Sequence, residues 1–194
     1  MKLSKAQLSQ IGIISALLLV AALWRLMPYW FPDLQDTLWN MAPVAAIGIF
    51  AAAYIKPRWL ALVLPVTVLF GSDVLITQYS GYPLFHDAFA WVYGSFALIV
   101  LLAYLLRGRV NLLNTTLALI GGSVLFFLIT NFGAWVMDDG TMYPDTFSGL
   151  LLSYELGLPF YRGTLFGDLL FGGVLFGGYA LLKSQLPVLR RAEA

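Results

Sequence analysis

Long apolar stretches separated by short polar gaps run through this chain, and the gaps alternate in charge. One kind of gap, together with the two chain ends, is basic and contains Lys2, Lys5, Lys56, Arg58, Arg107, Arg109, Lys183, Arg190 and Arg191. The intervening gaps are acidic and contain Asp33, Asp36, Asp87, Asp138, Asp139 and Asp145. This alternation is the positive-inside pattern of a protein that crosses a bilayer repeatedly. It predicts a multi-pass membrane protein with both termini in the cytoplasm.

The composition points the same way, because 60% of the 194 residues are hydrophobic and only 11% are charged. Soluble domains contain roughly 45–50% apolar and about 25% charged residues, so lipid must cover much of this surface. The net charge of +1 gives no reason to expect nucleic acid as a partner. The absence of cysteine excludes disulfides, thiolate metal sites and a cysteine nucleophile. We expect no metal and no cofactor.

The apolar stretches predict an all-α polytopic membrane protein in which residues 1–194 form a single transmembrane domain. Six spans are expected, at about 11–31, 40–55, 59–79, 88–106, 112–137 and 163–182. The segment at about 147–158 is apolar but too short to span, and Pro159 follows it. We predict a partial or re-entrant helix there, at the outer face, with its backbone satisfied by protein or by a wet cavity.

Several charged or strongly polar residues fall within the apolar spans, where such side chains are costly and mark candidate functional sites. They are Arg25, Asn40, Asp73, Asn131, Glu155, Arg162 and Asp168. All fall in the outer half of the membrane, which favours a pocket open to the outside over a continuous pore. Arg162 breaks the charge pattern, so we expect a carboxylate partner nearby, either Glu155 or Asp168. The alternative is a set of buried ion pairs that only fix helix packing.

Aromatic side chains crowd the same outer side, beyond what an aromatic belt at the headgroups explains. They would suit a flat or amphipathic ligand held between rings. The only histidine, His86, lies in an outer loop. It is either a solvated side chain or a pH-sensitive or metal-ligating group at the pocket mouth.

These observations predict two sets of site residues and one packing face. The ligand-binding set is Asn40, Asp73, Asn131, Trp135, Tyr154, Glu155 and Arg162. The accessory set is Arg25, Tyr79, Tyr82, His86 and Asp168. Ala42 and Ala46, four residues apart, form a small face that either packs helices within the chain or docks a partner membrane protein.

Four stretches carry a family resemblance: NMAPVAAIGIFAAAYI, LPVTVLFGSDVLI, LFFLITNFGAW and MYPDTFSGLLLSYELGLPFYRGTLFGDLLF. They resemble a family of uncharacterised bacterial membrane proteins of about this length, which implies a location in the bacterial inner (cytoplasmic) membrane. More distantly, the layout resembles the substrate-binding S-components of energy-coupling factor (ECF) vitamin transporters. That resemblance implies six helices, a vitamin-like ligand near the outer face, and an ECF-type coupling subunit with its ATPases as partners. Solitary cobalamin transporters of the BtuM type need no such partner, and similarity to them would make the ligand a corrinoid. S-components dock through an Ala-x-x-x-Ala face on early helices; Ala42 and Ala46 have that spacing, but in span two rather than span one.

We therefore expect an S-component-like binding and transport protein that takes up a small nutrient such as a vitamin, with no catalytic residues. One alternative is a non-catalytic scaffold or assembly subunit in which the polar cluster only sets helix packing. Another is an intramembrane enzyme with Asp73 and Asp168 as a carboxylate pair, which requires the two groups to lie within about 6 Å of each other.

Overall fold

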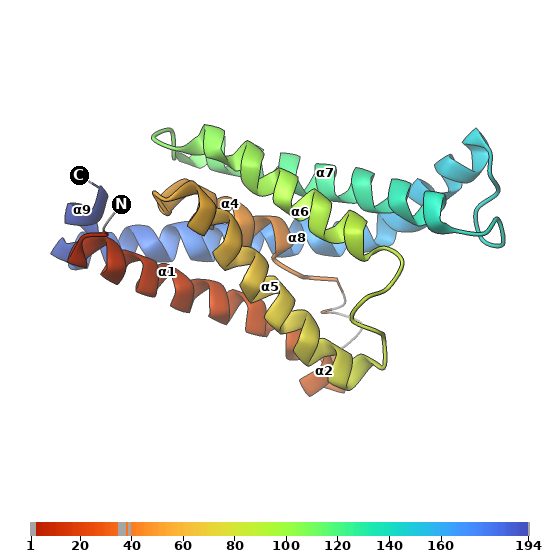
Figure 1. Cartoon of the computed structure of the whole chain (residues 1–194), viewed down its shortest axis with the longest axis horizontal. Coiled ribbons are helices and arrows are strands. Elements are labelled where there is room, and N and C mark those ends of the chain that lie inside the picture. Colours follow the sequence, from red (N-terminus) through yellow and green to blue (C-terminus); the bar gives the residue numbers. More distant parts are fainter. Residues whose placement is uncertain (1–2, 35–37, 39, 194) are drawn as a thin grey trace.

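A computed structural model describes residues 3–34, 38 and 40–193, and every regular element in these ranges is helical. In chain order the elements are α1 (Lys5–Leu23), η1 (Trp24–Leu26), α2 (Met27–Trp30), η2 (Pro32–Leu34), α4 (Val44–Tyr54), α5 (Arg58–Ser80), α6 (Phe89–Ala103), η3 (Tyr104–Leu106), α7 (Leu112–Met137), α8 (Phe147–Gln185) and α9 (Pro187–Glu193). The helices form an elongated bundle with both chain termini at one end (Figure 1). We call this the terminal end and the opposite one the loop end.

Among the described residues, five helical stretches are long and apolar enough to cross a membrane, which confirms the all-α, membrane-type character of the chain. They are Lys5–Trp30, Arg58–Ser80, Phe89–Leu106, Leu112–Met137 and Phe147–Gln185. The expected second span is instead the short helix α4, with 11 residues. It starts only at Val44 because Pro43 disfavours helical backbone in the residue before it. At about 1.5 Å per residue, α4 is roughly 16 Å long, which is about half the hydrocarbon thickness of a bilayer.

The short helix α4 forms the core of the bundle. Its residues from Val44 to Ala52 are all buried, and α1, α5, α6, α7 and α8 pack around it. A helix that is apolar on all sides belongs inside protein. Gly48 permits the closest approach, since a Cβ there would lie 2.8 Å from the Val100 side chain. Both ends of α4 therefore lie in or near the apolar interior of the bundle, where their backbone groups without partners in the helix need hydrogen bonds from elsewhere.

The amino-terminal end of α4 is capped by a carboxylate from another helix. One oxygen of Asp168, on α8, accepts a hydrogen bond from the backbone N–H of Ala46 at 2.9 Å. The other accepts a hydrogen bond from the Ser123 hydroxyl, on α7, at 2.6 Å. The carboxylate thus satisfies a backbone N–H in the first turn, which has no acceptor within the helix itself. Asp168 is fully buried, so its carboxylate joins three helices in the interior.

The carboxyl-terminal end of α4 is capped by a cation. The Arg107 guanidinium donates to the carbonyl oxygens of Ala52 at 2.8 Å, Ile55 at 2.5 Å and Lys56 at 3.0 Å. Burial lowers the pKa of Arg107 from its usual value, but arginine stays charged in proteins. The central helix thus has an acidic cap from α8 at one end and a basic cap at the other, from the turn that follows η3.

The predicted break at Pro159 is wrong. A single helix of 39 residues, α8, runs from Phe147 to Gln185 and includes Pro159 in its interior. Proline removes one helical hydrogen bond and bends a helix without necessarily ending it. In Figure 1 the amino-terminal part of α8 rises at an angle from the remainder. The residues at about 147–158 are therefore the first turns of the last long helix, and they form no separate re-entrant helix.

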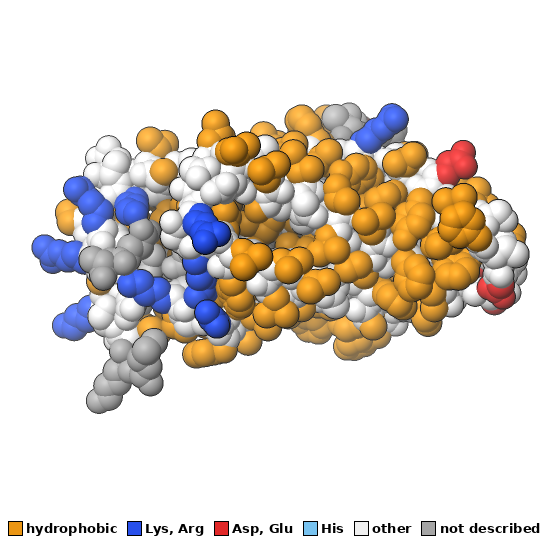
Figure 2. Space-filling model, turned by 90° about the horizontal axis from the view of Figure 1, so that it is seen from above, with side chains coloured by type: hydrophobic (Ala, Val, Ile, Leu, Met, Phe, Trp, Pro, Cys, Tyr) orange, Lys and Arg blue, Asp and Glu red, His pale blue; other side chains and the backbone are white. Residues whose placement is uncertain are grey.

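The two ends of the bundle differ in charge. On the face drawn in Figure 2, most Lys and Arg side chains gather at the terminal end, Asp and Glu side chains lie at the loop end, and a broad hydrophobic band separates the two groups; a basic side chain is also visible toward the loop end. Exposed leucines and phenylalanines on the long helices make up much of this apolar surface. The band is the surface that lipid would cover.

Candidate functional site

A hollow of about 770 Å³ opens toward the loop end. Toward this end α5 diverges from α6 (Figure 1). The lining of the hollow comes from η1, α2 and α5 together with α6, α7 and α8. The segment that leads into α4 contributes to the lining. Six of the predicted site residues line it: Arg25, Asn40, Asp73, Tyr79, Tyr82 and His86. The structure thus brings together residues that are up to about sixty positions apart in the sequence.

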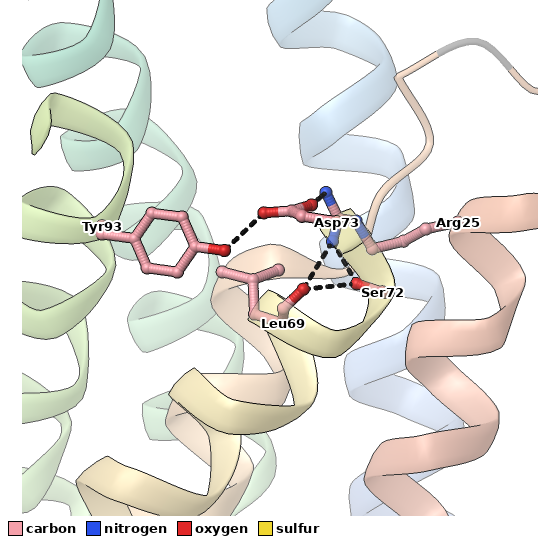
Figure 3. Close-up of polar contacts among 5 residues, drawn as sticks. All are labelled: Arg25, Leu69, Ser72, Asp73 and Tyr93. Carbon is pink, nitrogen blue, oxygen red and sulfur yellow. Dashed lines mark hydrogen bonds and ion pairs between the residues drawn. The ribbon is translucent and has the colours of Figure 1, made fainter. Parts of the chain in front are cut away.

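An ion pair forms part of the hollow's wall. Arg25 Nη2, on η1, lies 2.6 Å from Asp73 Oδ1, on α5. The hydroxyl of Tyr93, on α6, donates to the other carboxylate oxygen of Asp73 at 2.5 Å. The second terminal nitrogen of Arg25 donates to the Ser72 hydroxyl and, at 3.4 Å, to the Leu69 carbonyl oxygen. Figure 3 shows this network, which ties three elements together beside the hollow.

The network leaves the wall of the hollow close to electrically neutral. The side chains of Arg25 and Asp73 are 15% and 22% exposed, so the pair is shielded from solvent but still reaches the cavity. The neutral polar side chains around it include Asn40 and Thr77. Asn40 has a φ of 61°, a left-handed conformation that asparagine tolerates better than most residues. This conformation turns the chain toward the start of α4.

Aromatic rings form the rest of the wall near the mouth. Tyr29 and Tyr79 stack with ring centroids 6.1 Å apart and an interplanar angle of 29°. Tyr82 and His86 are exposed on the loop between α5 and α6, and the His86 ring lies 6.4 Å from that of Phe89. The mouth can therefore present ring faces and a few hydrogen-bonding groups to a molecule that enters from the loop end.

A smaller hollow of about 250 Å³ adjoins the first. The two share Asn40, Phe126 and Thr164 in their linings. Asn131 lines the smaller one, and its amide donates to the Phe127 carbonyl oxygen at 2.8 Å. Asn131 is thus the third member of the predicted ligand-binding set, after Asn40 and Asp73, that lies at a hollow of this site.

The other predicted ligand-binding residues lie elsewhere. Trp135 donates its indole N–H to the Pro144 carbonyl oxygen at 3.0 Å, and the Tyr154 hydroxyl donates to the Leu128 carbonyl oxygen at 3.2 Å. Glu155 and Arg162 are exposed on α8 and line neither hollow. Within the described ranges Arg162 has no ion pair, so the carboxylate partner expected for it is not found.

Three further predicted residues have structural positions that change their interpretation. Asp168 caps α4 and is bonded to Ala46 and Ser123, so it does not pair with Arg162. Ala46 is fully buried within the chain and Ala42 lines the hollow. The expected Ala42–Ala46 docking face is therefore corrected: these small side chains allow close packing inside the bundle, which leaves no Ala-x-x-x-Ala surface for a partner.

Two members of the network, Tyr93 and Ser72, are not among the residues predicted from the sequence. A usable signal existed, because α5 and α6 are consecutive and antiparallel, and Asp73 and Tyr93 lie at similar distances from their shared loop. Two groups at one depth on neighbouring helices are within reach of each other. The partners of Asp168 had no such signal, since its main contact is a backbone N–H of a helix from a distant part of the sequence.

Within the described residues, no three His, Cys, Asp or Glu side chains gather as metal ligands. No curated protein matches the chain, and no solved structure matches it. The family model DUF6580, described as a family of unknown function, matches residues 5–189. The chain therefore belongs to the DUF6580 family.

Proposed function

We propose that this chain is a membrane-embedded, S-component-like protein that binds a small nutrient such as a vitamin and takes part in its uptake. The observation that carries the proposal is the 770 Å³ hollow, which combines an ion pair, neutral polar groups and aromatic rings at the loop end. Its volume lies within the usual range of small-molecule sites, roughly 300–1,000 Å³. In this proposal the terminal end faces the cytoplasm of a bacterial inner membrane, in keeping with its basic residues, and the hollow faces outward.

The lining indicates the chemistry of the ligand. Arg25 and Asp73 neutralise each other, so the site offers no excess charge to attract an ion of either sign. Stacked tyrosines and amide groups favour an uncharged or zwitterionic molecule with a flat ring and a few hydrogen-bonding groups. The adjoining hollow, which shares Asn40 with the first, would extend the space for an elongated ligand. Corrinoids, the ligand class implied by the resemblance to solitary cobalamin transporters, are included in the screen described below.

The buried core around α4 separates this site from the terminal end, because its residues from Val44 to Ala52 are enclosed by neighbouring helices. Uptake would therefore require the helices to rearrange, either in a solitary transporter or together with a coupling subunit and ATPases. A coupling subunit would have to bind a lipid-facing surface other than Ala42 and Ala46, because Ala46 is inaccessible.

A second candidate function, a scaffold or assembly subunit, is favoured because the polar groups of the network pair with one another. Arg25, Asp73 and Tyr93 satisfy one another without a ligand, as expected for a scaffold or assembly subunit in which polar contacts set helix packing. The third function considered, a carboxylate-pair enzyme, has less support. Asp73 binds Arg25 and Tyr93, whereas Asp168 binds Ala46 and Ser123, so the two carboxylates belong to different networks.

A thermal-unfolding screen in detergent separates the first two functions. The compounds are cobalamin and other corrinoids, riboflavin, biotin, thiamine and folate. A ligand at about a hundred times its Kd adds roughly 2.7 kcal/mol of stability. Tyr82, which lines the hollow, and Phe147, which does not, are both 74% exposed, so Tyr82→Ala and Phe147→Ala form a matched pair.

We expect one compound to stabilise the wild type and Phe147→Ala, and to stabilise Tyr82→Ala less at the same concentration. A screen in which no compound stabilises the wild type would favour the scaffold. Equal stabilisation of both variants would place the ligand outside this hollow.

A further inference from the structure

A separate hollow of about 540 Å³ lies on the apolar surface between α6 and α7, toward the terminal end. Its floor includes Ile49 of the central helix and Ile99 of α6, both almost fully buried. Its rims include Leu105 and Leu117, which are 73% and 58% exposed. It shares no lining residue with the hollow at the loop end. In a membrane this groove would open to the hydrocarbon of the leaflet at the terminal end.

The length of the groove matches one leaflet. Along α7 its lining extends from Asn114 to Leu125. At about 1.5 Å per residue, this separation corresponds to roughly 16 Å. Half of the hydrocarbon core of a bilayer is about 15 Å thick. An acyl chain that enters the groove at the headgroup level would therefore be covered along most of its length.

A glycine keeps the groove open on the α7 side. A Cβ added to Gly121 would meet nothing within 4 Å. The next residue, Gly122, is different, because a Cβ there would lie 3.0 Å from the Ala45 side chain and 3.1 Å from that of Ile49. Gly122 thus allows α7 to pack closely against the central helix. Gly121 instead leaves space beside the groove, which a larger side chain would fill.

The groove ends at a basic residue. Arg109 belongs to its lining, follows η3 and is exposed. The Asn114 side chain donates to the Arg109 carbonyl oxygen at 2.8 Å, which holds the backbone of Arg109 next to the start of α7. An arginine guanidinium binds phosphate through paired hydrogen bonds. The groove therefore combines an acyl-sized apolar channel with a phosphate-binding cation at its headgroup end.

We propose that this groove binds an anionic phospholipid, with one acyl chain beside Gly121 and the phosphate at Arg109. The charge complementarity at Arg109 selects an anionic lipid over a zwitterionic one. Basic residues at the cytoplasmic ends of spans recognise such lipids, and one favourable contact corresponds to roughly a fivefold preference. The proposal is independent of the small-molecule site, because the two hollows lie at different ends of the bundle and share no residue.

The test is lipid retention by the full-length protein in detergent. Purified protein is incubated with equal amounts of dioleoyl-phosphatidylglycerol and dioleoyl-phosphatidylcholine, and bound lipids are counted by native mass spectrometry. Gly121→Leu fills the groove. Gly173→Leu is the matched control, because Gly173 is also an exposed helical glycine with nothing within 4 Å of an added Cβ, on α8. Arg109→Gln tests the headgroup contact, and helical circular dichroism shows that each variant is folded.

We expect the wild type and Gly173→Leu to retain phosphatidylglycerol roughly fivefold over phosphatidylcholine. Gly121→Leu should lose most of the retained lipid, and Arg109→Gln should retain the two lipids equally. Equal retention of both lipids by the wild type would overturn the assignment of an anionic headgroup. The same retention by Gly121→Leu and Gly173→Leu, or none by the wild type, would overturn the groove as the binding site.

Discussion

Replacing Asp168 with alanine tests whether a single carboxylate holds the start of the central helix. In the native structure this fully buried side chain accepts hydrogen bonds from the Ala46 N–H at 2.9 Å and the Ser123 hydroxyl at 2.6 Å. Alanine would leave the Ala46 N–H without an acceptor in the interior. A buried unsatisfied polar group costs about 1–3 kcal/mol, and loss of an N-cap costs about 0.5–2 kcal/mol.

These two contributions overlap, because both count the Ala46 hydrogen bond. Ser123 loses little, because its single hydroxyl proton can donate to the Leu119 carbonyl oxygen, 3.0 Å away, in place of Asp168. We therefore expect Asp168→Ala to lower the free energy of unfolding by about 2 kcal/mol. Asp168→Asn keeps an oxygen for the Ala46 N–H and has nearly the same shape. Its amide nitrogen can donate to Ser123, so its cost should be about 1 kcal/mol.

The assay is equilibrium unfolding in detergent micelles, followed by circular dichroism, for wild type, Asp168→Ala and Asp168→Asn. Asp145→Ala, at an exposed loop carboxylate, is the control for removal of a negative charge and should leave stability unchanged. If Asp168→Ala were as stable as Asp168→Asn, the carboxylate would not be an essential cap for α4. Asp168 would then have no structural role at the start of α4.

Three further perturbations test the packing of the bundle by the same unfolding assay. Arg25→Met should cost about 3 kcal/mol, because it leaves the Asp73 carboxylate in the bundle without its cation; combining it with Asp73→Leu should recover much of that loss. Gly133→Ala should cost about 1–3 kcal/mol by overpacking, since its Cβ would lie 2.2 Å from the Trp91 ring. Arg107→Met should cost about 2 kcal/mol, because charged hydrogen bonds to the last carbonyls of α4 are lost.

Each of these changes has a control in the chain. Gly121→Ala adds the same methyl group where nothing lies within 4 Å, so it should not destabilise the protein. Arg109→Met removes an exposed arginine from the same connection as Arg107 and should have little effect on unfolding. The account of the ion pair fails if the losses from Arg25→Met and Asp73→Leu simply add in the double variant.

The sequence predicts the membrane-type helical fold well, because length, apolarity and charge alternation are local properties. It also identifies Arg25, Asn40 and Asp73 as a group, since polar residues at one depth of an apolar bundle meet. The short helix α4 is harder to predict. An apolar run such as Asn40–Ile55 has the composition of a span, and only tertiary packing shows that Val44–Tyr54 is enclosed by protein rather than lipid.

The two errors at the end of the chain have a common cause. Proline often ends a helix, but a helix can also bend at proline and continue, as α8 does at Pro159. The prediction for Arg162 and Asp168 assumed that opposite charges close in sequence pair with each other. The structure instead uses Asp168 to satisfy the backbone of α4, a role that depends on where an otherwise unrelated helix begins.

Chemical labelling from outside the cell tests whether the hollow is an outward-facing binding site. The chain has no cysteine, so Thr77→Cys places a single thiol at the lining of the hollow, and Lys56→Cys places one at the terminal end. We predict that a membrane-impermeant maleimide labels Thr77→Cys in intact cells and labels Lys56→Cys only after permeabilisation, and that a compound found in the thermal screen protects Thr77→Cys. Labelling of Lys56→Cys alone in intact cells, or labelling of Thr77→Cys that no stabilising compound reduces, would contradict an outward-facing binding site.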